Sequence, residues 1–169
     1  LTKAKQPTEE AEKEFEKIKK SSRMIKGVEK VTVIDSFVVD KKSFLNTYHL
    51  SKESGKLSMI PGTNGTSYET ENGNNIVLSQ KDAKGNMQLY TQIKLINDWS
   101  KPELIASLES NSDINYPFLM TDGITLYFSS NGPESLGGYD IFVTRYDSDD
   151  RKYLKSNNLG MPFNSPFND

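Results

Sequence analysis

The stretch NYPFLMTDGITLYFSSNGPESLGGYDIF, residues 115–142, contains the starting points of three short apolar runs. They are Phe118–Met120, Ile124–Phe128 and Tyr139–Val143, with Asp122-Gly123 between the first two and a loop rich in Gly, Pro and Ser between the last two. Runs of this length joined by such turns are typical of a small antiparallel meander. One such sheet does not fold alone. We therefore expect the rest of the chain to supply neighbouring sheets.

An internal repeat connects this stretch to the one before it. When SYETENGNNIVLSQ (67–80) is aligned with PFLMTDGITLYFSS (117–130), Asn72-Gly73 corresponds to Asp122-Gly123, 50 residues later. Farther on, Gln88 corresponds to Asp140 at a spacing of 52 and Asn111 to Asn164 at 53, so the spacing changes only in loops. A period of this length, with about four short strands and no helical pattern, is typical of a propeller blade.

The predicted fold class is therefore all-β. We expect β-propeller blades, each a four-stranded antiparallel meander, in about two and a half repeats of 50–53 residues after a short N-terminal helix. Residues 1–27 form a charged arm and residues 28–169 a partial propeller. The propeller part divides into an incomplete first unit (28–65), a blade (66–114) and a second blade (115–169). Because closure protects the edges of a propeller, the remaining blades are expected from a longer chain or from a second copy.

The N-terminal arm is predicted to be helical from about Thr8 to Arg23, because acids gather near its start and lysines near its end. The expected i,i+4 ion pairs are Glu9–Lys13 and Glu16–Lys20. A narrow apolar stripe consists of Ala11, Phe15 and Ile18, with Met24 or Ile25. We interpret the arm as a mostly solvated helix that leans on the domain or tethers it; a partner-binding helix is the alternative.

The incomplete first unit is predicted to contain strands. The stretch VEKVTVIDSFVVD (28–40) alternates and is rich in β-branched residues, which favours strand over helix. The stretch Phe44–Leu57 is interpreted as two strand pieces joined by a turn at SKESG. His49 lies between the expected strand positions, and no partner at a metal-binding spacing accompanies it, so we assign it a structural role.

Several repeated residues have local structural roles. Asn72-Gly73 and Asp122-Gly123 are expected in two-residue hairpin turns with positive φ at glycine. Gly137-Gly138 is expected to admit another backbone beside the third strand. Trp99 and Tyr153 are placed at the start of the outer, fourth strand, followed by Pro102 and Pro162, which protect the edge from pairing. The residues predicted to be buried between sheets are Ile76, Leu78, Leu89, Leu126, Phe128 and Ile141.

Composition limits the classes of function. The 169 residues are 34% hydrophobic and 26% charged, as in a folded globular domain. The formal net charge of -2 leaves no basic excess for phosphates, so we expect no nucleic-acid partner. No apolar run approaches the roughly 20 residues that span a bilayer. There is no cysteine, which rules out disulfides and thiolate metal sites.

No catalytic, cofactor-binding or metal-binding residue is predicted. The stretch DSDDRKY (147–153) lacks the Gly and the distal Glu of a calcium loop, so Asp147, Asp149 and Asp150 are interpreted as a solvated hairpin tip. The long loop 131–138 is a candidate rim for binding, since binding residues favour loops on a rigid scaffold. No nucleophile elbow is present, and the one histidine is isolated. We therefore expect a protein that is not an enzyme. A glycosidase needs only two carboxylates, so this alternative stays open.

The pattern of residues 116–119, 121–123, 126–130, 137–142, 158–160 and 162–166 resembles the WD-repeat-like blade of TolB-type β-propellers. Within that group it is most similar to periplasmic and outer-membrane proteins of Bacteroidetes-type bacteria. The chain departs from the blade pattern at Asn72, where the second blade has Asp122, and at Gln88, where it has Asp140.

The resemblance implies an exported propeller in the periplasm or outer membrane of a Gram-negative bacterium, with its signal sequence removed. A lipid-modified cysteine ahead of Leu1 is compatible with it. The implied function is non-catalytic: a binding or scaffolding module for a protein, an envelope component or a glycan. The alternative is a fragment of a propeller-fold glycoside hydrolase.

Overall fold

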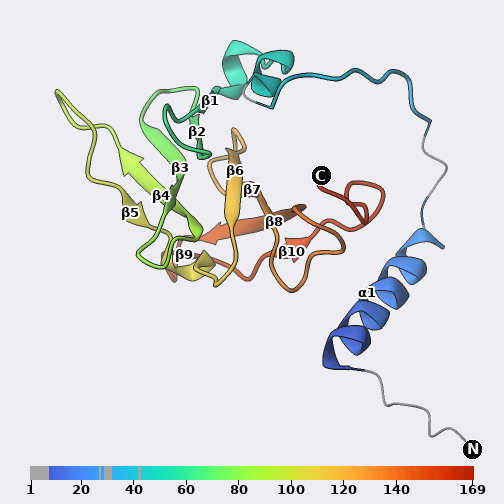
Figure 1. Cartoon of the computed structure of the whole chain (residues 1–169). Helices are drawn as coiled ribbons and strands as arrows, with labels where there is room; N and C mark the ends of the chain where they lie inside the picture. The colour runs from blue at the N-terminus through green and yellow to red at the C-terminus, as the bar shows by residue number, and fades with distance from the viewer. Residues whose placement is uncertain (1–7, 27, 29–31, 42) are drawn as a thin grey trace, which may run out of the picture.

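The structure is a computed structural model that describes residues 8–26, 28, 32–41 and 43–169. One α-helix, α1 (Glu9–Ile25), precedes a part built from strands and short 3-10 helices (Figure 1). The 3-10 helices are η1 (Phe44–Thr47), η2 (Lys52–Ser54) and η3 (Ala106–Leu108). The strands are β1 (Lys56–Met59), β2 (Thr66–Glu69), β3 (Asn75–Lys81), β4 (Met87–Ile93), β5 (Glu103–Leu104), β6 (Ile114–Leu119), β7 (Thr125–Ser130), β8 (Asp140–Asp147), β9 (Lys152–Tyr153) and β10 (Asn157–Asn158).

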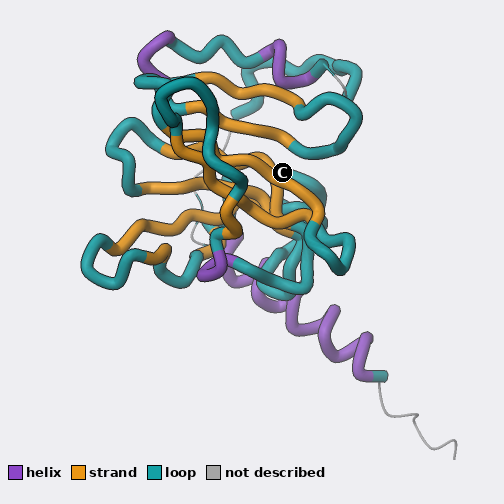
Figure 2. The backbone as a smooth tube through the Cα atoms, turned by 90° about the vertical axis from the view of Figure 1, so that its left-hand side faces the viewer, coloured by secondary structure: helices purple, strands orange, loops and turns teal. Residues whose placement is uncertain are grey.

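The strands form two antiparallel sheets of five strands. The first sheet has the order β1-β2-β3-β4-β5, and the second has the order β10-β8-β7-β6 with β9 also paired to β8. Strand β6 contacts β2, β3 and β4, so the second sheet stacks on one face of the first. Figure 2 shows the strands of both sheets in stacked layers, with α1 projecting away from them. The predicted all-β class is confirmed for this part of the chain.

Alternation along the strands creates a core between the two sheets. Successive side chains of a strand point to opposite faces, so Leu126 and Phe128 of β7 lie on the same face. Both are buried in one cluster with residues of the first sheet. The remaining buried members of this cluster are Tyr68, Val77, Leu89, Ile105, Leu108, Ile114, Leu119 and Phe142. Phe128 stacks on Phe142 with ring centroids 5.8 Å apart.

The two sheets repeat the same turn. The N–H of Gly73 donates to the carbonyl of Thr70, and the N–H of Gly123 donates to that of Met120, both at 2.9 Å. Positive φ is confirmed at Gly73 (65°) and Gly123 (68°). The predicted two-residue loop is wrong, because the closing backbone bonds join Thr70 to Asn75 and Met120 to Thr125. Each loop therefore has four residues between its closing pair.

The outer, fourth strand predicted for each blade is present in both sheets. Trp99 bridges Lys94 just ahead of β5, and Tyr153 of β9 pairs with Tyr146. Both aromatics thus lie at the start of the outer edge, as the sequence predicts. In the second sheet this edge is split, because β9 pairs with the end of β8 and β10 pairs with its beginning.

The strands predicted for residues 28–40 are not found among the described residues 32–40, which are irregular and exposed. Their β-branched side chains have no neighbouring strand to pack on; Ile34 is 97% exposed. The part of this prediction that concerns residues 29–31 lies outside the described residues. The first strand piece predicted within Phe44–Leu57 is wrong, because η1 replaces it and His49 is in an exposed, irregular segment. The predicted SKESG turn contains η2. Only β1 forms, and it joins the first sheet through β2.

The predicted N-terminal helix is confirmed. The Thr8 side chain accepts a hydrogen bond from the Ala11 N–H at 3.3 Å, which caps α1. The Glu9–Lys13 pair forms at 2.8 Å, whereas Glu16 pairs with Lys19 at 3.0 Å and not with Lys20.

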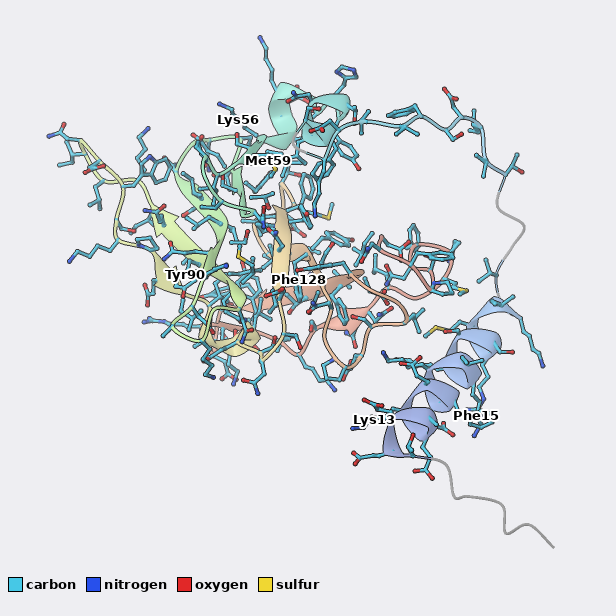
Figure 3. The ribbon with its side chains drawn as sticks, viewed as in Figure 1. Lys13, Phe15, Lys56, Met59, Tyr90 and Phe128 are labelled. Atoms are coloured by element: carbon cyan, nitrogen blue, oxygen red, sulfur yellow. The ribbon has the colours of Figure 1, made fainter. Side chains whose placement is uncertain are left out.

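The apolar stripe of α1 does not face the sheets. Phe15 is 63% exposed and extends from the side of the helix that is turned away from them (Figure 3). Met24, at the end of the predicted stripe, does approach the loop after β10: its methyl carbon lies 3.5 Å from the position that a Cβ on Gly160 would occupy. The helix therefore touches the domain with its last turn.

Candidate binding site

In the part of the chain that the structure describes, the second sheet has one face that no other sheet covers. On β7, Tyr127 and Ser129 alternate with the core residues Leu126 and Phe128, so they point away from the first sheet. On β8, Ile141 and Val143 pair with Ser129 and Tyr127, which places them on the same side. We call the surface formed by Tyr127, Ser129, Ile141 and Val143 the open face. Phe118, opposite Tyr127, does not belong to it, because its ring packs on Tyr68 of the first sheet with ring centroids 4.9 Å apart.

Two of the six residues predicted to be buried between sheets are only partly buried. Leu126, Phe128, Leu78 and Leu89 are buried as the sequence predicts, whereas Ile76 and Ile141 are only half-buried. Ile141 lies on the open face, and Ile76 lies on the side of the first sheet away from the second. Neither position is covered by another sheet among the described residues, although Ile141 borders the cleft that η1 helps to form.

A cleft of about 610 Å³ lies along the inner part of the open face. Its walls are mostly apolar. They come from η1 and the residues around it, from β1 and β2 of the first sheet, from strands of the second sheet and from the C-terminal residues. The aromatic lining residues are Phe44, Tyr48, Tyr116, Phe118 and Tyr139. Polar groups stand at its margin, namely Lys41, Thr66, Ser129, Asn168 and Asp169. An apolar hollow with a few polar groups is the usual form of a binding pocket.

The aromatic rings of the cleft contact one another edge to face. Ring centroids of Phe44 and Tyr116 are 5.7 Å apart, and those of Tyr116 and Tyr139 are 6.3 Å apart. Tyr116 has a positive φ of 55°, beside an irregularity in the pairing of β6 with β7. Edge-to-face pairs of this kind are favourable beyond their buried area. They hold η1 against the second sheet.

Two tyrosines of the cleft, Tyr116 and Tyr139, have raised pKa values. Burial raises the pKa of Tyr116 above its ordinary value. Burial, followed by the charge of Asp113 and a hydrogen bond to its carboxylate, raises the pKa of Tyr139 to about 12. Both hydroxyls therefore stay protonated and available as hydrogen-bond donors and acceptors at physiological pH.

The C-terminal residues form one margin of the cleft. The Gly138 N–H donates to the Phe167 carbonyl at 2.9 Å, and the Asp169 N–H donates to the Tyr139 carbonyl at 2.7 Å. A Cβ on Gly137 would lie 2.3 Å from the backbone of Pro166, so only glycine fits there. The expectation that Gly137-Gly138 admits another backbone is confirmed.

The other repeat-signature residues shape the sheets and do not line the cleft. Asn72 and Asp122 accept backbone hydrogen bonds within their turns: Asn72 from Asn74 at 3.0 Å, and Asp122 from Ile124 at 2.9 Å. Trp99 lies under the Lys94 ammonium, 5.4 Å from the nitrogen to the ring centroid.

The difference between Gln88 and Asp140 has a structural basis. Each is fully buried near the start of an equivalent strand, Gln88 on β4 and Asp140 on β8. The Gln88 amide donates to the carbonyls of Ser110 and Ser112 at 3.0 and 2.9 Å, and its oxygen accepts from the Ser110 N–H at 3.0 Å. The Asp140 carboxylate accepts from the Leu136 N–H and from the Asn158 amide, both at 2.7 Å. Both side chains bind neighbouring segments, Gln88 as a donor and acceptor and Asp140 as an acceptor.

The loop 131–138, predicted as a candidate rim for binding, does not line this cleft. Its Ser135 and Leu136 are buried, and the Leu136 N–H is bound by Asp140 as described, whereas Pro133 and Glu134 are exposed. The acidic stretch Asp147–Asp150 is a hairpin tip, as predicted: Asp147 accepts the N–H of Asp149 at 2.9 Å, and Asp150 pairs with Lys152 at 2.9 Å.

The sequence did not identify the cleft residues Phe44, Tyr116 and Tyr139. A signal was present for two of them. In the repeat, Tyr116 corresponds to Thr66 and Tyr139 to Met87, so aromatic rings replace smaller or flexible side chains at the same position. Phe44 lies outside the repeat, and no pattern connects it to the second sheet.

Comparisons with protein-family models, with curated proteins and with solved structures found no match for this chain. In the described part of the chain, no helix has both the length and the apolar character needed to span a bilayer.

Proposed function

We propose that this chain is a non-catalytic, propeller-type module of the cell envelope that binds or scaffolds a partner through the open face and its aromatic cleft. The observation that carries the proposal is the cleft itself. Five aromatic side chains from three separate segments converge on one hollow of about 610 Å³. Aromatic residues are enriched at the energetic centres of binding surfaces, because they bury a large area at low entropic cost.

The rigidity of the site supports a binding role. The floor of the cleft is a hydrogen-bonded sheet, and the Phe44 wall is held by ring contacts with Tyr116. A preformed surface loses little conformational entropy when a partner binds, so more of the contact energy appears as affinity.

The resemblance to TolB-type propellers supports the placement in the periplasm or outer membrane and the propeller architecture. The repeated turn and the repeated fourth strand position agree with successive units of one repeat. Partners of the proposed class are an envelope protein, another envelope component or a glycan.

The geometry favours binding over glycoside hydrolysis. Glycosidases of the common types act with two carboxyl groups that flank the bond to be cleaved. Among the described residues that line the cleft, Asp169 supplies the one carboxylate. The cleft thus offers an aromatic surface and hydroxyl groups in place of the paired acids.

A capture experiment with matched variants tests the proposal. The immobilised chain is exposed to envelope extract of a Gram-negative bacterium, and the bound material is compared with that held by Phe44→Ser and Phe163→Ser. Phe44 lines the cleft, whereas Phe163 is 65% exposed and lies outside it. We expect Phe44→Ser to lose the bound component and Phe163→Ser to retain it. Equal capture by both variants, or turnover of glycosides that requires Asp169, would overturn the proposal.

A further inference from the structure

The open face is the repeat equivalent of a surface that is already buried in this protein. On the first sheet, Tyr68, Val77, Ser79 and Leu89 face the second sheet, and each is at most 2% exposed. The equivalent positions on the second sheet are Phe118, Tyr127, Ser129 and Ile141. Phe118 packs on Tyr68 and Ser129 is buried, whereas Tyr127 and Ile141 on the open face are only half-buried. The positions of Val77 and Leu89 are therefore covered by a sheet, and among the described residues their equivalents Tyr127 and Ile141 are not.

The surface that covers the first sheet also has a repeat equivalent. The second sheet presents Leu126, Phe128 and Phe142 to the first sheet, and all three are buried. Their equivalents are Ile76, Leu78 and Tyr90, which lie on the side of the first sheet away from the second. We call this surface the far face. Figure 3 labels Tyr90, which belongs to it, and Phe128, the equivalent of Leu78, which lies in the core between the sheets.

The chain thus has two surfaces that correspond to the two halves of its own internal interface. The far face has the aliphatic and aromatic side chains of a docking surface, and the open face has those of the surface that receives it. Covering an apolar sheet surface lowers the free energy, because apolar area is removed from water. Sheets are commonly covered by stacking another sheet on them in an aligned orientation.

We propose that two copies of this chain associate head to tail: the far face of one copy docks on the open face of the other. This contact repeats between molecules the stacking of the two sheets within one chain. The proposal rests on the proposed function of the open face as a binding surface, and it names the partner. A contact between two different surfaces of identical chains is heterologous: it closes into a ring or continues as an open assembly.

The contact between copies is expected to be weaker than the internal one. Inside the chain, Asn115 at the start of β6 binds Thr66 and Asn64 of the first unit at 2.9 and 2.8 Å. In the repeat, Gly65 occupies the position of Asn115, so an incoming first sheet lacks this carboxamide. In addition, η1 covers the inner part of the open face, which leaves the part around Tyr127 and Val143 for the second copy. We therefore expect reversible association.

Light scattering and sedimentation over a concentration series test the proposal. We expect the average mass of the unmodified chain to rise above 19.1 kDa with concentration. Tyr127→Glu on the open face and Tyr90→Glu on the far face are each expected to hold the mass at the monomer value. Ile96→Glu, at a residue that is 98% exposed and on neither surface, is the control that should associate normally.

Mixing the two variants distinguishes a head-to-tail contact from a symmetric one. Tyr127→Glu keeps an intact far face, and Tyr90→Glu keeps an intact open face. In an equal mixture, the far face of the first variant can therefore dock on the open face of the second, and no other contact of this kind is possible. We expect the mixture to form dimers and no larger species. Circular dichroism confirms that each variant is folded, and Tyr127→Ser with Tyr90→Ser replaces the pair if either glutamate variant unfolds.

Three results would overturn the proposal: a constant monomer mass up to about 200 µM, a range that detects contacts of micromolar affinity; association that neither variant weakens; or a mixture that stays monomeric. The proposed function has its own readout. If the chain stays monomeric while capture from envelope extract still depends on Phe44, the open face binds a different partner and only the present inference fails.

Discussion

The side-chain oxygen of Asn115 accepts a hydrogen bond from the Thr66 hydroxyl at 2.9 Å and thereby connects the two sheets across 49 residues of sequence. The same oxygen accepts a hydrogen bond from the Ser79 hydroxyl, and the Asn115 amide donates to the Asn64 carbonyl at 2.8 Å. Asn115, Thr66 and Ser79 are all buried. This carboxamide is thus a buried polar connection within an otherwise apolar interface.

Removing this connection should destabilise the fold. Asn115→Ala leaves two buried hydroxyls and a carbonyl without their present partner, and an unsatisfied buried polar group costs about 1–3 kcal/mol. We expect a loss of that size in the free energy of unfolding, measured by urea denaturation. Asn111→Ala is the matched control, because Asn111 is exposed and bonds only the Lys84 ammonium, at 3.4 Å. Equal losses in both variants would show that the connection contributes nothing specific.

Core packing gives a larger expected loss. Phe128 is 3% exposed and stacks on Phe142, so Phe128→Ala leaves a cavity between the sheets. Substitutions of this type cost about 3–5 kcal/mol. Phe163→Ala, at an exposed ring, should cost much less. A loss below about 1 kcal/mol for Phe128→Ala in equilibrium unfolding would contradict the assignment of this residue to the core.

The sequence predicted the parts of the fold that are determined locally. Asn72-Gly73 and Asp122-Gly123 mark equivalent turns because a positive φ and an Asx cap both depend on neighbouring residues. The alternation around Leu126 and Phe128 likewise shows which side chains share a face. These signals suffice for two similar sheets, and they identified the strands that form the floor of the cleft.

The same signals failed where the local structure depends on contacts with residues that are distant in the sequence. Residues 32–40 alternate like a strand, but a strand needs a neighbour for its backbone hydrogen bonds, and no strand pairs with this segment in the described part of the chain. The cleft was missed for a similar reason. Phe44 meets Tyr116 only because η1 folds back over the second sheet, and no spacing in the sequence predicts that contact.

Two glycines should respond differently to alanine. Gly123 has a φ of 68° and open space where a Cβ would lie, so Gly123→Ala costs only backbone strain, about 1–2 kcal/mol. At Gly137 the added Cβ meets the Pro166 backbone at 2.3 Å, so the C-terminal residues must shift. We expect Gly137→Ala to increase proteolysis after residue 160, and Gly123→Ala to leave that cleavage unchanged. Gly123→Asn should be tolerated better than Gly123→Ala, since asparagine accepts positive φ more readily.

Acid should weaken the second turn more than the first. Hydrogen bonds from the backbone N–H groups of Thr125 and Ile124 hold the pKa of Asp122 below its ordinary value of 3.8. A lowered folded-state pKa gives stability that is present above 3.8 and is lost as the pH falls through the folded value. Asp122→Asn should keep the turn, as Asn72 does at the equivalent position, and remove this part of the acid sensitivity. Identical acid profiles of the free energy of unfolding for the two proteins would contradict the role of the carboxylate.

Alkali should act on the cleft through Tyr139. Its pKa is raised from 10.0 to about 12 by burial and by Asp113, so the folded protein holds this proton more tightly than the unfolded chain. The resulting stability is fully present below pH 10.0 and is lost as the pH rises toward the folded value. Tyr153, whose pKa burial also raises to about 12, should contribute in the same pH range from outside the cleft. We therefore expect Tyr139→Phe and Tyr153→Phe each to reduce the alkaline loss of stability, measured by denaturation between pH 9 and 12. Only Tyr139→Phe should also change the alkaline dependence of capture from envelope extract, because only Tyr139 lines the cleft. If both variants changed capture alike, binding would depend on overall stability and not on the cleft.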